Sequence, residues 1–299
     1  IDPSYGRSGR QPEKEPGMLK RLMALVLGGV AIAGMAQAQN AAPAAASRPE
    51  ISLWRLDCGE IRVTDLDVFS DTYAYVGRQM TLTDSCYLIR NGDRFLLWDT
   101  GLPGEIAGGP GGGEGPFRMS LRERIRDQLA RIGVRPEQVT FVGISHYHDD
   151  HIGQAADFPG ATLLIGAADW EAIRGRPSTA ARFQPWIEGQ SRSQPLRGDH
   201  DVFGDGSVIV LNMPGHTPGH RTLLVRLPRT GPVMLTGDLY HFTENMRTGR
   251  LPIFNTDRAD TLASMARFQE IARNLRARII IQHEPDHIRQ LPAFPQAAQ

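Results

Sequence analysis

The chain has 299 residues, and its 33 Lys and Arg balance its 33 Asp and Glu, so the formal net charge is zero. Because there is no basic excess to neutralise phosphates, a nucleic-acid partner is not expected. Hydrophobic residues make up 40% and charged residues 22%, which is a globular composition. The length suits one large domain or two small ones.

The lysine distribution excludes two kinds of chemistry. Lysine occurs only at Lys14 and Lys20, and every later cation is arginine. Schiff-base catalysis and a P-loop therefore have no lysine to use in the body of the chain. The glycine-rich run from Gly108 to Gly115 lacks the Gly-Lys-Ser/Thr ending of a P-loop, so it predicts a flexible loop.

The N-terminal region has the pattern of an export signal. Residues 1–17 read as a leader upstream of the natural start. Residues 18–38 then have the basic start, apolar stretch and small-x-small cleavage site of a secretory signal peptide. These parts are Lys20-Arg21, Leu22 to Met35, and Ala36-Gln37-Ala38. Export to a periplasm is therefore expected.

The apolar stretch of the signal is too short to cross a membrane as a helix, so no stable membrane anchor is expected. Residues 39–50 form an Ala/Pro-rich linker, and residues 51–299 form the remaining globular domain. An oxidising compartment permits a disulfide between Cys58 and Cys86. Both cysteines lie in apolar, strand-like segments, which favours two buried thiols and leaves a bridge open.

Short β-branched runs alternate with helical periodicity after residue 50. The strand predictions are Ile51–Leu56, Cys86–Ile89, Phe95–Trp98, Phe141–Ile144, Thr162–Ile165, Val208–Met213, Thr222–Leu227, Val233–Leu235 and Ile279–Ile281. Helical spacing covers Leu121 to Ile132 and Leu262 to Leu275, the second with a start at Thr256 or Asp257. Asn91-Gly92 and Gly204-Asp205-Gly206 are hairpin-turn signals. The pattern indicates a layered α/β or α+β fold.

Four potential metal ligands fall within six residues directly after the predicted strand Phe141–Ile144. Imidazole nitrogen and carboxylate oxygen are ligand types that zinc accepts. A loop that runs from a strand into a helix lets alternate residues point to different sides, so the cluster can serve two metals. Its members are His146, His148, Asp150 and His151.

Three further polar residues follow other strand-like runs, and these are His216, Asp238 and His283. Loops at strand ends are where α/β folds place sites. Seven ligands divide well between two metals. One metal takes His146, His148 and His216, the other takes Asp150, His151 and His283, and Asp238 bridges them.

Other candidates have simpler interpretations. His200 lies in a charged turn and His287 lies past the last strand, so both are read as ordinary surface or hydrogen-bonded histidines. His220 follows a Gly-rich turn and is read as a packing residue or a support for a ligand. Asp149 occupies the variable position of the cluster and is read as a surface or supporting carboxylate.

The His-x-His-x-Asp-His motif, with the later His, Gly-Asp and His, resembles the metallo-β-lactamase superfamily. The resemblance covers roughly residues 51–291. It implies an α/β (α+β) fold, the αβ/βα four-layer sandwich of two packed mixed sheets flanked by helices, and makes residues 51–299 a hydrolase domain. Finer strings resemble the N-acyl homoserine lactonase family, and they are Asp84–Ile89, Trp98–Gly101, Pro214–His220, Thr236–Asp238 and Gln282–Glu284.

The resemblance implies a quorum-quenching lactonase with two divalent metal ions, zinc by default, and a small acyl lactone as substrate. A metal-activated water would open the ring, and Asp150 would relay a proton to the leaving oxygen. The family's oxyanion-binding tyrosine lies three residues after the bridging aspartate. Here Tyr240 is two residues on and His241 is three, so either could bind the oxyanion, and Tyr240 is slightly preferred.

Other functions stay open. A zinc β-lactamase is disfavoured because such enzymes usually lack an aspartate equivalent to Asp238. A broad lactone or ester hydrolase, a nuclease or phosphodiesterase, and a metal-binding protein without turnover are further alternatives. Homodimers are common in the family, so the resemblance implies one, but nothing else in the sequence supports it.

An acyl chain needs an apolar groove. Aromatic or aliphatic groups outside the strand pattern occur in Phe69–Tyr75, in the Gly-rich loop up to Phe117, and in Phe183–Ile187. These segments could line such a groove, or they could belong to the ordinary core.

Overall fold

The computed structural model describes residues 50–299. The leader, the signal peptide and nearly all of the linker predicted from the sequence lie outside these residues. Within the described part, no helix combines the length and the apolar character needed to cross a membrane.

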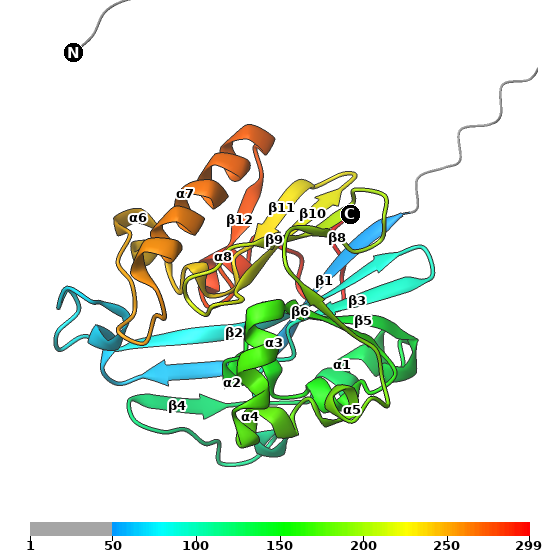
Figure 1. Cartoon of the computed structure of the whole chain (residues 1–299), viewed down its shortest axis with the longest axis horizontal. Coiled ribbons are helices and arrows are strands. Elements are labelled where there is room, and N and C mark those ends of the chain that lie inside the picture. The colour runs from blue at the N-terminus through cyan, green and yellow to red at the C-terminus, as the bar shows by residue number, and fades with distance from the viewer. Residues whose placement is uncertain (1–49) are drawn as a thin grey trace, which may run out of the picture. The chain divides into compact units, whose positions relative to one another are not determined.

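Two sheets form the centre of the molecule (Figure 1). The first has seven strands in the order β4-β1-β2-β3-β5-β6-β7, and the second has five in the order β12-β11-β10-β9-β8. The first sheet is mixed, because β3, β5, β6 and β7 run parallel while β1, β2 and β3 form an antiparallel meander. The second is also mixed, because β12 runs parallel to β11 while the other neighbours are antiparallel. The bounds are β1 Ile51–Val63, β2 Met80–Asn91, β3 Arg94–Trp98, β4 Phe117–Ser120, β5 Val139–Ile144, β6 Thr162–Gly166, β7 Ser193–Leu196, β8 His200–Asp201, β9 Val208–Asn212, β10 Arg221–Leu227, β11 Gly231–Leu235 and β12 Arg278–Ile280.

The predicted strands all form, but the first two are much longer than their apolar runs. β1 and β2 pair from Ile51 with Asn91 to Val63 with Met80. Their extra residues include charged and hydroxyl side chains, which the search for apolar runs did not count. Both turn signals are confirmed, since Gly92 lies between β2 and β3 and Gly204 between β8 and β9.

A disulfide joins Cys58 of β1 to Cys86 of β2. The preference for two buried thiols is therefore wrong. In the register of β1 and β2, Cys86 pairs with Leu56, and Cys58 lies unpaired in the irregularity between Asp57 and Gly59. The Cα atoms of the two cysteines are 5.8 Å apart. That distance is ordinary for a bridge, and sequence spacing could not reveal the shift in register.

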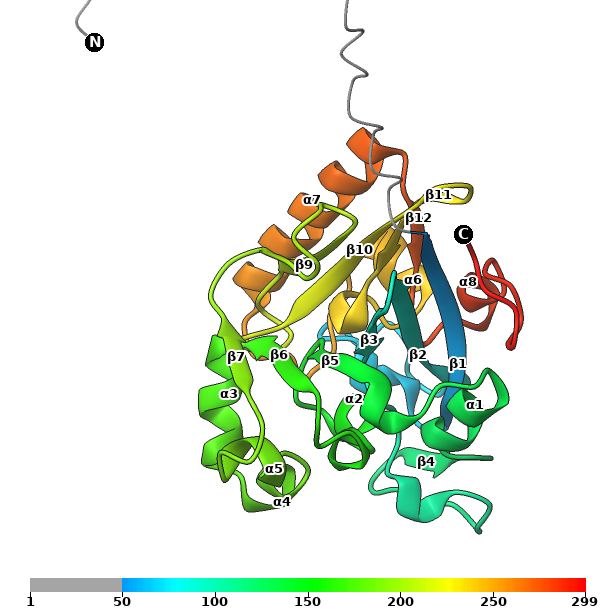
Figure 2. The ribbon, with the colours of Figure 1, turned by 90° about the vertical axis from the view of Figure 1, so that its right-hand side faces the viewer.

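The two sheets pack face to face around one apolar layer, and Figure 2 shows the strands of both sheets from a second direction. Leu96 and Trp98 of the first sheet face Leu223 and Val225 of the second. Neighbouring residues on β3, β5 and β6 point to opposite sides of their sheet, and both sides are buried. Strands covered on both faces read as continuous apolar runs, which is why the sequence located them.

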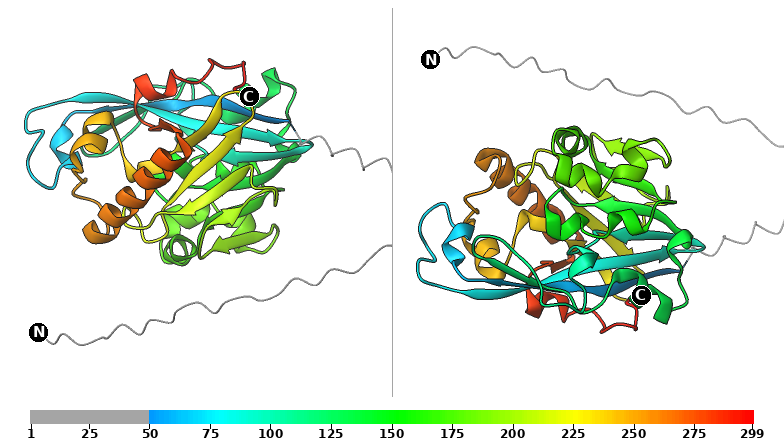
Figure 3. Two further views of the ribbon diagram at one scale, coloured as in Figure 1. Left: turned by 90° about the horizontal axis from the view of Figure 1, so that it is seen from above. Right: turned by 90° about the horizontal axis from the view of Figure 1, so that it is seen from below.

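Helices cover the outer face of each sheet, so the fold is the expected four-layer sandwich (Figure 3). α7 lies on the second sheet, with Met265 and Phe268 against Leu224 and Met234. Helices α1 and α3 cover the first sheet. The helices are α1 Ile125–Arg131, α2 Asp149–Ile152, α3 Ala167–Arg174, α4 Pro177–Ala181, α5 Gln184–Ile187, α6 Thr243–Thr248, α7 Arg258–Leu275 and α8 Pro285–Ile288.

Local capping explains where the two predicted helices begin. The Asp257 side chain accepts the Asp260 backbone N–H at 2.8 Å, so α7 begins at Arg258 as the sequence suggested. α1 begins only at Ile125, four residues after Leu121, where the Gln154 side chain accepts the Ile125 N–H. This partner is distant in sequence, so the later start could not be seen.

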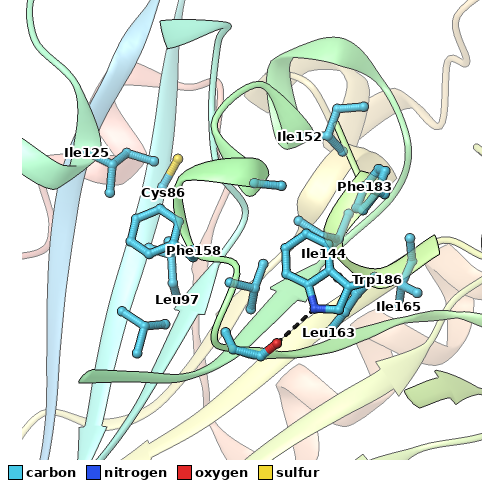
Figure 4. Close-up of a cluster of buried hydrophobic side chains, with 14 of the residues drawn as sticks. Cys86, Leu97, Ile125, Ile144, Ile152, Phe158, Leu163, Ile165, Phe183 and Trp186 are labelled. Atoms are coloured by element: carbon cyan, nitrogen blue, oxygen red, sulfur yellow. Dashed lines mark hydrogen bonds between the residues drawn. The ribbon is translucent and has the colours of Figure 1, made fainter. Parts of the chain in front are cut away.

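One predicted groove segment belongs to the core instead. Phe183 and Trp186 are buried against Ile144, Leu163 and Ile165 of the first sheet (Figure 4). The Trp186 indole donates to the Ala161 carbonyl at 2.8 Å. Of the two alternatives left open for Phe183–Ile187, a groove and the ordinary core, the structure therefore shows the core for Phe183 and Trp186.

Candidate metal centre and substrate pocket

The seven predicted ligands come together at one edge of the two sheets. They lie on four segments that follow β5, β9, β11 and β12. Potential ligand atoms form two groups, and within each group all of them lie within 4.8 Å of one another. The first group is His146, His148, His216 and Asp238, and the second is Asp150, His151 and His283.

Asp238 lies between the two groups. Its Oδ1 is 2.9 Å from His283 Nε2 and 3.1 Å from His151 Nε2. Its Oδ2 is 3.4 Å from His216 Nε2 and 3.5 Å from His146 Nε2. One carboxylate therefore presents one oxygen to each group, which is the geometry that the bridging assignment requires.

Buried partners on the far side of the rings orient three of the histidines. His151 Nδ1 is 2.9 Å from Asp99 Oδ2, and His283 Nδ1 is 2.9 Å from the Thr83 carbonyl oxygen. The Ser145 hydroxyl is 3.0 Å from His146 Nδ1. With Nδ1 occupied, each ring presents Nε2 to the centre, as metal-binding histidines commonly do.

Asp99 supports the ligands from outside the predicted set. Besides His151, its carboxylate accepts the Ser145 N–H at 2.7 Å and the Gln282 side-chain N–H at 2.9 Å. Its φ is +57°, a conformation that aspartate tolerates better than most residues. The signal was the Trp98–Gly101 string, which was used only for the family resemblance. Gly101 is also required there, because a Cβ would lie 2.5 Å from Cys58 Cβ.

Helix α3 holds the loop between β9 and β10 through hydrogen bonds. Asp169 of α3 accepts the Thr217 hydroxyl at 2.7 Å and the Gly219 N–H at 2.6 Å. His220 in the same loop donates from Nδ1 to the Met213 carbonyl, and its Nε2 accepts the Asp238 N–H at 3.0 Å. His220 is thus a support for the bridging aspartate.

The remaining histidines agree with their simple interpretation. His200 Nε2 lies 3.5 Å from the Gln194 side-chain nitrogen, and His287 contacts Thr243 and the Ile281 backbone. Neither belongs to either group of ligand atoms.

Burial and mutual repulsion keep part of the cluster uncharged. Burial, with His216 nearby, lowers the pKa of His148 to about 3. Burial also lowers the pKa of His146 well below its usual range, with His151 adding to the effect. A neutral imidazole keeps the lone pair that a metal needs.

The carboxylates of the cluster favour a charge on neighbouring histidines, and the histidines favour a charge on the carboxylate of Asp238. Burial opposes a charge on His283, but Asp238 and Asp150 more than offset it and raise the pKa of His283 to about 9. Burial also opposes ionisation of Asp238, yet the surrounding histidines, His151 first, hold the pKa of its carboxyl well below its usual range.

The residues present fit two divalent cations. His146 Nε2 is fully buried and has no hydrogen-bond partner, which is costly unless another group completes it. Five imidazoles and two carboxylates make up the two groups, and such nitrogen and oxygen donors suit zinc and related metals. His146, His148 and His216 would hold one ion, Asp150, His151 and His283 the other, and Asp238 both.

Comparison with known proteins agrees with the fold and the cluster. The model of the metallo-beta-lactamase superfamily matches residues 82–283. The chain belongs to this superfamily.

Similar proteins of known name show which family of the superfamily the chain belongs to. An N-acyl homoserine lactonase of a Bacillus species is 28% identical over 227 residues, which cover 74% of this chain and 88% of the relative. The N-acyl homoserine lactonase AttM of Rhizobium johnstonii is 30% identical over 212 residues, 67% of this chain and 81% of the relative. Within the superfamily, the chain is therefore a member of the N-acyl homoserine lactonase family. The members of this family are hydrolases.

A solved structure extends the likeness over the whole fold. It is an N-acyl homoserine lactone hydrolase with the product N-hexanoyl-L-homoserine bound at its catalytic metal centre. The TM-score is 0.70 at 25% identity, and the match covers 84% of this chain and 99% of that chain.

In this member of the superfamily, a cavity of about 280 Å³ opens directly above the metal centre. His148, Asp149, Asp150, Asp238, His241 and His283 line its polar side. The rest of the wall is apolar and consists of Ile61, Phe69, Leu82, Phe117, Met119 and Phe254.

The apolar wall was only partly predicted. Phe69 and Phe117 lie in segments that the sequence nominated, whereas Phe254 was not considered. The Phe254 ring is 5.5 Å from the Phe69 ring and 6.1 Å from the His148 ring, measured between centroids. The wall therefore reaches the metal ligands themselves.

The preference for Tyr240 as the oxyanion-binding residue is wrong. The Tyr240 hydroxyl accepts from the Gln269 side chain at 3.2 Å, and its ring packs on Phe268 in the core under α7. Burial raises the pKa of Tyr240 to about 12. His241 lines the cavity instead, with Nε2 at 3.0 Å from Asp238 Oδ2. The backbone at Tyr240 is extended, so consecutive side chains point to opposite sides.

Proposed function

We propose that this protein hydrolyses the lactone ring of N-acyl homoserine lactones with two divalent metal ions, most simply zinc. The observation that carries the proposal is the position of Asp238 between two complete ligand groups at the floor of an apolar pocket. The relatives in the lactonase family support the same substrate class.

Two metals bound at this centre would lower the pKa of a water toward about 7 and polarise the lactone carbonyl. The chain's own residues provide the remaining parts. His241 is the pocket-lining imidazole that is not a ligand, and its Nε2 can donate a hydrogen bond to the carbonyl oxygen as charge develops there. Burial lowers the pKa of His241, so the ring is a neutral donor.

Asp150 is placed to move a proton. Its carboxylate lies 3.8 Å from both His151 Nε2 and His283 Nε2, and it lines the pocket. A side chain in this position can carry a proton to the oxygen that leaves when the ring opens. Phe69, Phe117 and Phe254 exclude water from one side of the centre and can contact the acyl chain.

The proposal includes a cellular location. The signal-like residues 18–38 support export, and the disulfide between Cys58 and Cys86 is compatible with an oxidising periplasm. A homodimer without a stable membrane anchor and without a nucleic-acid partner completes the proposal.

The first experiment is a pH-indicator assay of acid release from a long-chain acyl homoserine lactone and from a cephalosporin, run in parallel. Chelator-treated protein, with and without added zinc, is the control. Metal-dependent opening of the lactone alone supports the proposal. Turnover of the cephalosporin alone would contradict it and favour a zinc β-lactamase. A third arm with a simple aryl ester separates a broad ester hydrolase from a lactonase.

A further inference from the structure

Asp149 is the one carboxylate in the described pocket wall that belongs to neither ligand group. It is the first residue of α2, and its side chain is exposed. No hydrogen bond or ion pair to another described residue occupies it. Aspartate side chains ordinarily ionise far below neutral pH, and burial, with Asp150 nearby, raises the pKa of Asp149 from that usual value.

Among the described residues, no basic side chain pairs with this carboxylate. Neither Lys nor Arg is among the residues that line the pocket within the described chain. Arg182 lies close enough to influence Asp149, but its guanidinium forms an ion pair with Glu105 at 2.6 Å. Glu114 and Asp150 add further negative charge near Asp149.

We infer that Asp149 makes the pocket select by charge, so that it admits an uncharged acyl lactone and weakens the binding of carboxylate-bearing molecules. This inference rests on the proposed function. Ring opening converts a neutral ester into a carboxylate, and a metal centre attracts carboxylates. A fixed negative charge at the mouth therefore favours release of the product. It also opposes entry of cephalosporins, which carry a carboxylate.

The test measures binding rather than turnover. Ring-opened N-octanoyl-L-homoserine and its neutral carboxamide are titrated calorimetrically into the zinc-loaded protein at low and high salt. For Asp149→Asn, we expect the carboxylate to bind about five-fold more tightly relative to the carboxamide, and the effect to shrink at high salt because the charge is exposed. Asp149→Glu should restore the original ratio.

Glu137→Gln is the matched control, because it removes the same charge at an exposed position just before β5, whereas the pocket residues follow the other end of that strand. If it shifts the ratio as Asp149→Asn does, net charge is responsible and the inference is overturned. Equal changes for both probes, or weaker carboxylate binding, would overturn it too. Failure of the proposed function looks different: the unaltered protein would open no lactone, whatever the ratio of the two affinities.

Discussion

The metal cluster and the apolar wall meet in one pocket, yet they are built differently. Asp99, Ser145 and Thr83 hold histidines of the cluster through buried hydrogen bonds. The wall is held by packing instead, because Ile61, Phe69 and Leu82 are buried in one apolar cluster. Phe254 is 38% exposed and is positioned by ring contacts with Phe69 and Phe117.

The difference separates two tasks. Metal ligation tolerates little displacement, so each ligand is fixed by partners that are themselves buried. Apolar contact tolerates more, because it depends on area rather than direction. We therefore expect changes in the cluster to affect every substrate, and changes in the wall to affect only substrates that reach it.

The largest effect is expected for Asp238→Ala. The change removes both carboxylate oxygens, of which one faces each ligand group, and it leaves His151 Nε2 and His283 Nε2 without their nearest carboxylate. Metal content should fall, and turnover should drop by more than the about 100-fold typical of an outer partner. Elemental analysis together with the lactone assay measures both.

His200→Ala is the control for a lost histidine, because His200 lies outside both ligand groups. It should keep its metal and its activity. An Asp238→Ala protein that retained two metals and normal turnover would break the distinction between cluster and wall.

The pH dependence of stability gives the next largest effect, through Asp169 beneath the His216 loop. Burial raises the pKa of Asp169 to about 6, above the ordinary value of 3.8. Between these two values the folded state binds more protons than the unfolded state. The free energy of unfolding should therefore fall as pH rises from about 4 to 6, by on the order of 3 kcal/mol.

Urea unfolding of chelator-treated protein at several pH values checks this expectation. Asp169→Asn has no carboxyl group to titrate at this position. Its free energy of unfolding should therefore rise relative to that of the unaltered protein between about pH 4 and 6, and the difference should stay constant above about pH 6. A difference that is flat with pH, or that runs the other way, would show that Asp169 does not link the loop to pH.

The sequence alone located the metal ligands better than the residues that hold them in place. Each ligand follows an apolar run that can be recognised as a strand, so His146, Asp238 and His283 could be placed at one sheet edge. Asp99 and Asp169 act through partners about 50 residues away. Asp99 does follow the apolar run Phe95–Trp98, but no local pattern shows which distant residue either aspartate contacts.

The wall was harder for a different reason. Phe254 and Phe183 are both aromatic residues in irregular segments, yet one lines the pocket and the other lies in the core. Only the tertiary fold distinguishes them. Tyr240 and His241 differ likewise by which side of an extended backbone each occupies, a choice that counting residues from Asp238 left open.

A smaller effect is expected for Asp99→Asn. Asparagine tolerates the left-handed backbone and keeps one oxygen for the Ser145 N–H, but it removes the charge that faces His151 Nδ1. Affinity for metal should fall by about 10- to 100-fold. Competition with a zinc chelator measures it, and thermal unfolding of the chelator-treated proteins shows whether the fold is intact. An unchanged affinity would mean that orientation of His151 does not depend on this carboxylate.

The smallest effect concerns the wall and is the sharpest test of the comparison. Phe254→Ala removes apolar area without touching a ligand, so metal content should be unchanged. The value of kcat/KM should fall by about 5- to 10-fold for a long-chain lactone, and less for a short-chain one that contacts less of the wall. Ile253→Ala serves as the control, because Ile253 is 65% exposed and does not line the pocket. An equal loss at every chain length would place Phe254 with the catalytic groups rather than with the acyl-binding surface, because only an interaction with the common lactone ring is independent of the chain.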